Sequence, residues 1–211
     1  MIVSDQHQFV FVAIPKTGTR SIYNICRRQY GFKIYKEHCE IVPEVYQDYK
    51  KFTIVRNPYD RFLSMWWSTC IRPDDRGAAG AVKKTVNGSK DLHDLLKYLC
   101  IKNDDDFGPG KLFTRQCDYL DCTSFDYILH TENLQEEFST LPFLDKEKNN
   151  SLGNINSTRS KWKKNVEVRN TDPWEYIDQE SLDMINEYYK QDFELLPEYT
   201  KINSCPNTHE N

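Results

Sequence analysis

The sequence predicts an α/β protein with a P-loop-like three-layer fold, in which helices flank a central parallel sheet. Two short, almost continuous apolar runs, QFVFVAI (8–14) and KFTIVRN (51–57), support this prediction. A turn and then a helix with apolar periodicity follow each run. Because buried strands that alternate with helices are typical of parallel sheets, we expect both runs to be strands of one such sheet.

Length and composition narrow the class of protein. With 211 residues the chain favours a single domain over 1–211. A charged fraction of 28% and a net charge of −4 indicate a globular protein and do not suggest bulk nucleic-acid binding. No apolar run approaches the ~18 residues of a membrane span. Seven irregularly spaced cysteines without a C-x-x-C pair favour free thiols over a zinc or redox site, and hence a cytoplasmic location.

The first third of the chain predicts two strand-loop-helix units. After the strand 8–14 we expect a helix from Thr19 to about Tyr30, which Gly31 ends. FKIY (32–35) predicts a further strand, and a short helix begins near Pro43. After the strand 51–57, Pro58 opens a helix that continues to about Cys70.

Later segments are punctuated by polar stretches. We expect a flexible, basic excursion over 72–90, a helix over 91–100 with Asp91 as its cap and His93 on its solvent-facing side, and a loop over 103–111. FDYILHTENLQEEFSTL (125–141) predicts a strand to His130 and then a helix with Thr131 as candidate cap. A polar, basic loop follows over 149–165, and the last helix covers about 179–196.

The turn IPKTGTRS (14–21) is a candidate anion site. Backbone N–H groups from Thr17 to Ser21 can converge on one anion at the start of a helix, and Lys16 can add a charge. The hydroxyls of Thr17, Thr19 and Ser21 are further possible donors. The loop is not the common nucleoside-triphosphate loop, which has lysine after its second glycine. An ordinary strand-to-helix turn, in which Gly18 relieves backbone strain, is the alternative.

A second candidate is VRNPYDRFLSMWW (55–67). Arg56 follows its strand at the ligand-facing edge of the predicted sheet, and Ser64 lies two helical turns further on. A guanidinium group offers a planar fork for a phosphate, and a serine hydroxyl can complete the grip. Alternatively, Arg56 and Arg61 form ion pairs with Asp60 or other nearby acids.

Taken together, these two segments resemble the PAPS-dependent sulfotransferases, where PAPS is 3′-phosphoadenosine 5′-phosphosulfate, and in particular the branch that contains carbohydrate sulfotransferases. IPKTGTRSI resembles the family's P-K-x-G-x-[ST]-[ST] loop, and VRNPYDRFLS matches its R-[ND]-P-[YFW]-x-R-x-x-S motif at every fixed position. FDYILHTENLQEEF, NINS and YYKQDFELLPEY are similar to later family motifs.

The resemblance implies roles for particular residues. The 5′-phosphosulfate would contact the loop residues Lys16, Thr17, Gly18, Thr19, Arg20 and Ser21. Arg56 and Ser64 would hold the 3′-phosphate. Arg20 departs from the family, which usually has Thr or Ser at this position, so its own role is open. PAPS would be the donor, PAP (adenosine 3′,5′-bisphosphate) the product, and no metal is expected.

Sulfuryl transfer also needs a base for the acceptor hydroxyl and a cation for the leaving phosphate. Lys16 is the natural cation. His38 lies just after the strand 32–35, on the sheet edge of Lys16 and Arg56, and relatives in the carbohydrate branch often carry a histidine here. We therefore favour His38 as the base, with Glu37 and Glu40 as rivals, or a plain surface histidine as the alternative.

The sequence supports a sulfotransferase that acts on a hydroxyl acceptor, with a glycan as the expected partner. A P-loop-type nucleotide kinase and a non-catalytic nucleotide-binding relative are the alternatives. Against the kinase stands the missing G-x-x-x-x-G-K-[ST] loop. Candidate acceptor contacts are the basic residues Arg72, Arg76, Lys83, Lys84 and Lys90 and the aromatic residues Trp66, Trp67 and Trp162.

Overall fold

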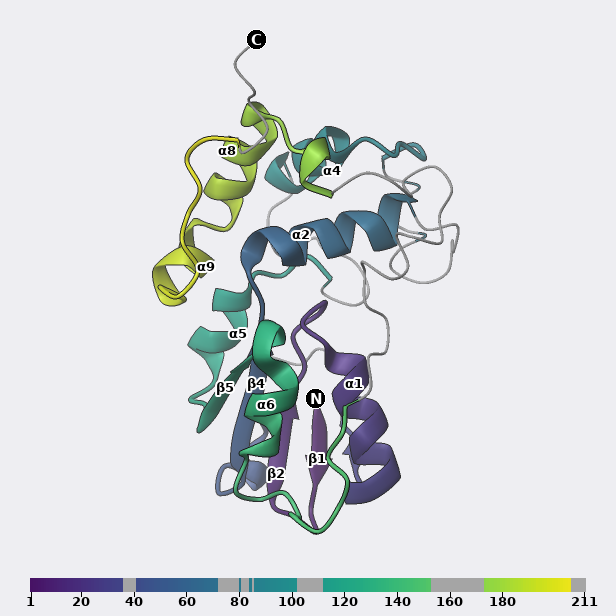
Figure 1. The fold of residues 1–211 in the computed structure, drawn as a ribbon, viewed down its shortest axis with the longest axis vertical. Coiled ribbons are helices and arrows are strands. Elements are labelled where there is room, and N and C mark those ends of the chain that lie inside the picture. Colours follow the sequence, from purple (N-terminus) through teal and green to yellow (C-terminus); the bar gives the residue numbers. More distant parts are fainter. Residues whose placement is uncertain are drawn as a thin grey trace. The chain divides into compact units, whose positions relative to one another are not determined.

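The computed structural model describes residues 1–35, 41–71, 80, 84, 86–101, 112–152 and 173–205. The chain divides into two compact units, one formed by Met1–Asn57 and Arg115–Asn156 and the other by Pro58–Thr114 and Ser157–Asn211. Each unit has its own hydrophobic core. We call them the sheet unit and the helical unit, and Figure 1 shows their elements.

The sheet unit contains five strands in the order β3-β1-β2-β4-β5. Figure 1 labels β1, β2, β4 and β5. They are β1 (Ile2–Ser4), β2 (Phe9–Val12), β3 (Lys33–Ile34), β4 (Lys50–Val55) and β5 (Tyr127–His130). β2, β4 and β5 are parallel, with Val12 opposite Thr53 and Val55 opposite His130. The α/β class with a central sheet flanked by helices is therefore confirmed.

One strand was missed by the sequence analysis. β1 pairs antiparallel with both β2 and β3, so neighbouring strands are parallel only over β2, β4 and β5. All three residues of β1 are buried, but three residues are too few for an alternating or periodic pattern. The chain returns to β2 through a turn in which Gln8 has a positive φ of 50°.

The sheet unit also contains three helices. Two lie where the sequence predicts them: α1 (Thr19–Ile25), which continues as a π-helical turn over Cys26–Tyr30, and α6 (Leu134–Ser139). The third, α5 (Gln116–Cys122), was not predicted. Short 3-10 turns cover Glu44–Tyr46 and Thr131–Asn133. Gly31, with φ 54°, ends the first helix as expected. Ile22 and Ile25 of α1 and Phe138 of α6 share one core with Phe11 and Phe52 of the sheet.

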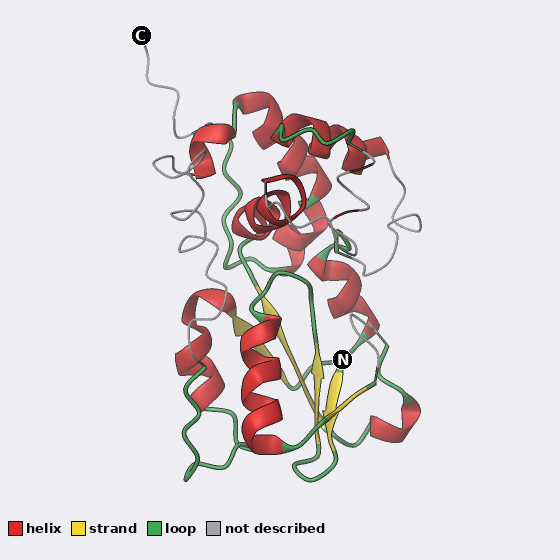
Figure 2. Cartoon of the chain, turned by 90° about the vertical axis from the view of Figure 1, so that its right-hand side faces the viewer, coloured by secondary structure: helices red, strands yellow, loops and turns green. Residues whose placement is uncertain are grey.

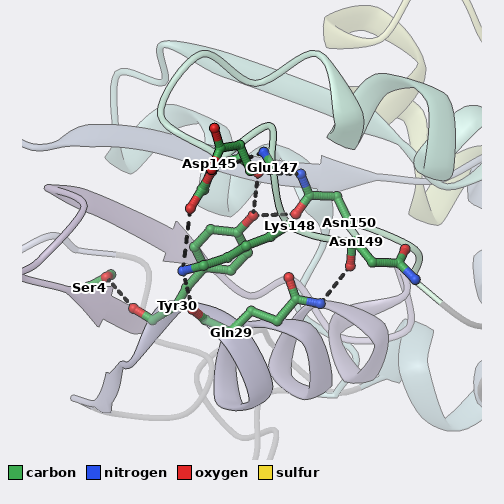
Figure 3. Close-up of polar contacts among 8 residues, drawn as sticks. All are labelled: Ser4, Gln29, Tyr30, Asp145, Glu147, Lys148, Asn149 and Asn150. Carbon is green, nitrogen blue, oxygen red and sulfur yellow. Dashed lines mark hydrogen bonds and ion pairs between the residues drawn. The ribbon is translucent and has the colours of Figure 1, made fainter.

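Gln29 and Tyr30, at the end of the helix that begins with α1, form hydrogen bonds with residues 148–150, which follow α6 (Figure 3). The Tyr30 hydroxyl donates to the side chain of Asn150, and the Tyr30 carbonyl accepts from Ser4 Oγ at 3.0 Å. Lys148 Nζ lies 5.1 Å from the centre of the Tyr30 ring and donates to the Gln29 carbonyl at 2.8 Å. Burial raises the pKa of the Tyr30 hydroxyl, so it remains a donor at neutral pH. These contacts hold residues 148–150 against the end of this helix, within the sheet unit.

In the described residues of the helical unit, the regular elements are all helical (Figure 2). They are α2 (Pro58–Trp66) with a π-helical turn over Trp67–Ile71, α4 (Leu92–Ile101), a 3-10 turn over Pro173–Tyr176, α8 (Gln179–Tyr188) and α9 (Lys190–Leu195). The predicted last helix is thus interrupted at Tyr189. Most of the excursion 72–90 and all of the loops 103–111 and 159–165 lie outside the described residues.

Two expectations for α4 differ in outcome. Asp91 accepts from the His93 backbone N–H at 2.9 Å and caps the helix as predicted. His93 was expected to face solvent, but its Nδ1 lies 3.4 Å from Ser181 Oγ and its Nε2 lies 3.1 Å from Glu180 Oε1. Packing of α4 against α8 therefore overrides the polar side that the helical periodicity assigned to His93.

Replacing Asp178 by alanine is expected to destabilise the protein by about 1 kcal/mol at neutral pH, because Asp178 caps α8. Its carboxylate accepts from the Ser181 backbone N–H at 2.8 Å, and this bond lowers the pKa of Asp178 below 3.8. The stabilisation is therefore full above pH ~4 and disappears as pH falls through the lowered value. Urea unfolding at pH 7 and pH 3 measures it. Glu187→Ala, at the exposed far end of α8, is the control, and an equal loss in both variants would contradict the capping role.

Candidate functional site

The loop between β2 and α1 has an unusual backbone. Lys16 and Gly18 adopt left-handed φ angles of 72° and 95°, and α1 begins at the next residue, Thr19. At Gly18 an added Cβ would lie 3.0 Å from Leu134 Cδ2, so both conformation and space favour glycine there. A left-handed lysine costs on the order of 1 kcal/mol and persists only where neighbouring groups hold it.

Hydrogen bonds to this loop hold its shape. The Thr17 and Thr19 hydroxyls both donate to the Ile14 carbonyl, at 3.0 and 2.9 Å. These hydroxyls were expected to donate to an anion, whereas in the structure both donate to this carbonyl oxygen. Ser21 is buried, and its backbone N–H donates to the Gly18 carbonyl at 2.9 Å.

The backbone N–H groups at the start of α1 are the main donors of the loop. Within the part of the chain that the structure describes, those of Thr17, Gly18, Thr19 and Arg20 donate to no protein acceptor. The N-cap residue, Gly18, has no side chain that could cap α1. Consecutive N–H groups without acceptors at a helix N-terminus form an anion-binding arrangement. Arg20 is exposed at the second position of this helix.

Arg56 lies beside this loop, although forty residues separate it from Lys16. Its Nη1 donates to the Lys16 carbonyl at 3.2 Å. The Gln116 side-chain amide brackets the Arg56 backbone, accepting from its N–H and donating to its carbonyl, both at 2.8 Å. Because β2 and β4 are parallel neighbours, the residues that follow them meet at one edge of the sheet. Two cationic residues of the sheet unit are thereby brought together.

Ser64, the third residue of the second motif, belongs to the helical unit. It lies in α2 with 5% of its surface exposed. Arg61 in the same helix is fully buried, and its Nη2 donates to the Thr114 carbonyl at 2.6 Å. Arg61 therefore contributes to the packing of the helical unit.

The favoured base, His38, and its rivals Glu37 and Glu40 lie outside the described residues. The strand before them is described. β3 pairs antiparallel with β1, which is antiparallel to β2, so β3 and β2 run in the same direction. The chain therefore leaves Ile34 and Tyr35 toward the sheet edge at which β2 leads to Lys16.

Three polar residues at this edge were not recognised as site residues from the sequence. Thr131, expected to cap a helix, instead places its hydroxyl 3.0 Å from the Thr17 carbonyl and 2.9 Å from the Val55 carbonyl. Glu132 Oε1 accepts from the Asn57 N–H at 3.0 Å, and Gln116 brackets Arg56. The available signal was the position of Thr131 and Glu132 directly after a strand of the same parallel sheet.

Among the residues described, no group of three or more His, Cys, Asp or Glu side chains is arranged to hold a metal ion. Likewise, no helix within the described ranges has the length and apolar character needed to cross a membrane.

A strand-to-helix loop with N–H groups lacking acceptors and two adjoining cationic residues is typical of enzymes that bind nucleotides through phosphate or sulfate groups. The model of the sulfotransferase family matches residues 1–200, and the chain belongs to this family of PAPS-dependent enzymes. The matched residues belong to both units. That residues 1–211 form one sulfotransferase-like domain stays a prediction. Comparisons with curated proteins and with solved structures found no match.

Proposed function

We propose that this protein transfers the sulfuryl group of PAPS to a hydroxyl group of a carbohydrate. One observation carries the proposal: four consecutive backbone N–H groups, from Thr17 to Arg20, have no acceptor in the described chain and lie beside the contact between Lys16 and Arg56. The loop from Lys16 to Ser21 would bind the 5′-phosphosulfate. Arg56, with Ser64, would bind the 3′-phosphate.

Arg20 is assigned to the same phosphosulfate. Side chains of a helix tilt toward its N-terminus, so a side chain at the second position leans toward the loop. Arg20 is exposed and has room to do so. Its charge would supplement that of Lys16, where most relatives offer only a hydroxyl group.

The proposed chemistry is a single in-line displacement. The base, assigned to His38, takes the proton of the acceptor hydroxyl as its oxygen forms a bond to sulfur. The bond between sulfur and the bridging oxygen of the 5′-phosphate breaks, and its electron pair stays on that oxygen. Lys16 and the loop N–H groups stabilise the charge that develops there. The products are the sulfated acceptor, PAP and a protonated base, and no redox partner is required.

The carbohydrate acceptor rests on the resemblance to the carbohydrate branch. Of the aromatic residues expected to stack on a sugar, Trp66 and Trp67 are 1% and 8% exposed and lie in the core of the helical unit, so they are not available. Trp162, Arg72, Arg76 and Lys83 lie outside the described residues, whereas Lys84 and Lys90 are exposed. A glycan array with labelled PAPS identifies the acceptor, and a silent array would favour a non-catalytic relative.

The proposed location is the cytoplasm. The described cysteines 26, 70, 100, 117, 122 and 205 are all free thiols, as is usual in a reducing compartment. Burial raises the pKa of the Cys26 thiol to about 12, so this group remains a thiol at neutral pH.

Titration calorimetry tests the donor. Adenosine 3′,5′-bisphosphate is expected to bind at least tenfold more tightly than AMP, which lacks only the 3′-phosphate, and more tightly than ATP. Arg56→Ala should remove the preference over AMP, because it deletes the guanidinium group assigned to the 3′-phosphate. Tight ATP binding together with indifference to the bisphosphate would instead support a nucleotide kinase.

A further inference from the structure

A single hydroxyl connects the two halves of the candidate nucleotide site. Thr131 Oγ1 lies 3.0 Å from the carbonyl oxygen of Thr17, in the loop, and 2.9 Å from that of Val55, the last residue of β4. Thr17 is 114 residues away from Thr131 in the sequence, and Val55 is 76 residues away. Arg56 follows Val55 directly. The hydroxyl has one proton, which it can donate to either carbonyl or share between both in a bifurcated bond. It therefore bridges the segment that would bind the phosphosulfate and the strand that presents the arginine of the 3′-phosphate motif.

The bond to Thr17 also fixes the direction of an N–H group. The C=O and N–H of a trans peptide point in opposite directions, and the described residues contain no cis peptide. With its carbonyl held by Thr131, the peptide between Thr17 and Gly18 directs the Gly18 N–H away from Thr131. The Arg56 guanidinium acts in the same way on the peptide between Lys16 and Thr17. It donates to the Lys16 carbonyl, so the Thr17 N–H points away from Arg56.

We infer that Thr131 is a positioning residue for nucleotide binding. It holds the loop so that its N–H groups face the anion, and it fixes the spacing between this loop and Arg56. Thr131 touches neither donor nor acceptor in this role and acts through the two carbonyl oxygens. The inference rests on the proposed function, since the anion is taken to be the 5′-phosphosulfate end of PAPS.

Thr131→Val tests it, because valine keeps the shape of the side chain and removes only the hydroxyl. The affinity for adenosine 3′,5′-bisphosphate, measured by calorimetry, is expected to fall about tenfold, in line with one lost hydrogen bond and a misplaced loop. Thr131→Ser should restore the affinity to within about twofold of the parent protein.

Thr53→Val is the matched control. Thr53 is buried in β4, and its hydroxyl donates to the Val12 carbonyl of β2 at 2.9 Å. Like Thr131→Val, this variant therefore loses one hydroxyl that donates to a backbone carbonyl of a neighbouring segment. It leaves the loop contacts in place. Its thermal stability can fall, but its affinity for the bisphosphate should match that of the parent. Equal losses of affinity in Thr53→Val and Thr131→Val would reduce Thr131 to a general structural role and overturn the inference.

A ligand-free measurement separates this inference from the proposed function. Hydrogen exchange of the Ser21 amide, which is protected by its bond to the Gly18 carbonyl at 2.9 Å, should be faster in Thr131→Val than in the parent or in Thr53→Val. If the parent protein does not bind the bisphosphate, the proposed function fails, whereas this exchange still reports whether Thr131 holds the loop. If the parent binds it and Thr131→Val binds it equally well with unchanged exchange, the inference alone fails.

Discussion

Replacing Lys16 by alanine is expected to reduce sulfuryl transfer from PAPS by about 10²–10³-fold, the usual cost of removing one group that stabilises transition-state charge. Lys16 is half-buried in the loop, where a charge is screened less than in bulk water. Alanine keeps the Cβ, so the cost of the left-handed backbone does not change, and the carbonyl of residue 16 can still accept from Arg56. The variant should therefore fold normally. Transfer of labelled sulfate to the best acceptor from a glycan panel measures the effect.

Lys50→Ala is the matched control for this experiment. Lys50 begins β4, at the opposite end of the strand from Arg56, and forms an exposed ion pair with Asp126 at 2.8 Å. Lys50→Ala removes one positive charge from the sheet unit, as Lys16→Ala does, but it should change the transfer rate by less than twofold. Similar losses in both variants would mean that the net charge of the protein, not the position of Lys16, drives the transfer.

The second large effect is expected for His38→Ala, which should lower the transfer rate by about 10²–10⁴-fold through loss of the general base. Because a histidine accepts a proton only while it is neutral, the parent rate should fall toward acid pH. The residual transfer rate of the variant should not show this fall at acid pH. Binding of adenosine 3′,5′-bisphosphate should remain within a few-fold of the parent, since the base acts on the acceptor hydroxyl.

Glu37→Gln and Glu40→Gln decide between His38 and its rivals. Each removes one carboxylate from the segment that follows β3 while keeping nearly the same size. We expect both to retain most of the activity. Full activity in His38→Ala with a loss in one of these two variants would transfer the role of base to that glutamate.

The two specific motifs could be recognised from the sequence because they rest on local signals. The apolar runs that became β2 and β4 lie next to Pro15, Gly18 and Pro58, residues that restrict the backbone within a few positions of themselves. The start of α1 at Thr19, and the end at Gly31 of the π-helical turn that continues it, follow from the same local rules. A loop that needs a left-handed glycine is visible in sequence, whereas the left-handed Lys16 is not, because lysine is also common in ordinary backbone conformations.

Other features depended on contacts between distant segments. β1 is too short to show a pattern, and only its pairing with β2 and β3 makes it a strand. Trp66 and Trp67 were candidates for sugar stacking, but the packing of α2 in the helical core buries both. Thr131 follows its strand as a helix cap would, yet its hydroxyl lies between two carbonyls from earlier segments.

The sequence by itself determined the order of strand, loop and helix, the two cofactor motifs and the membership of a sulfotransferase family that they imply. These depend on residue types at short spacing, and the backbone preferences of glycine, proline and apolar runs act over the same range. Only the tertiary structure decided that Arg56 contacts Lys16, that Gln116 brackets Arg56 and that Thr131 joins the loop to β4. A hydrogen bond between residues 40 to 114 positions apart depends on how the strands are ordered in the sheet, which short-range patterns do not specify.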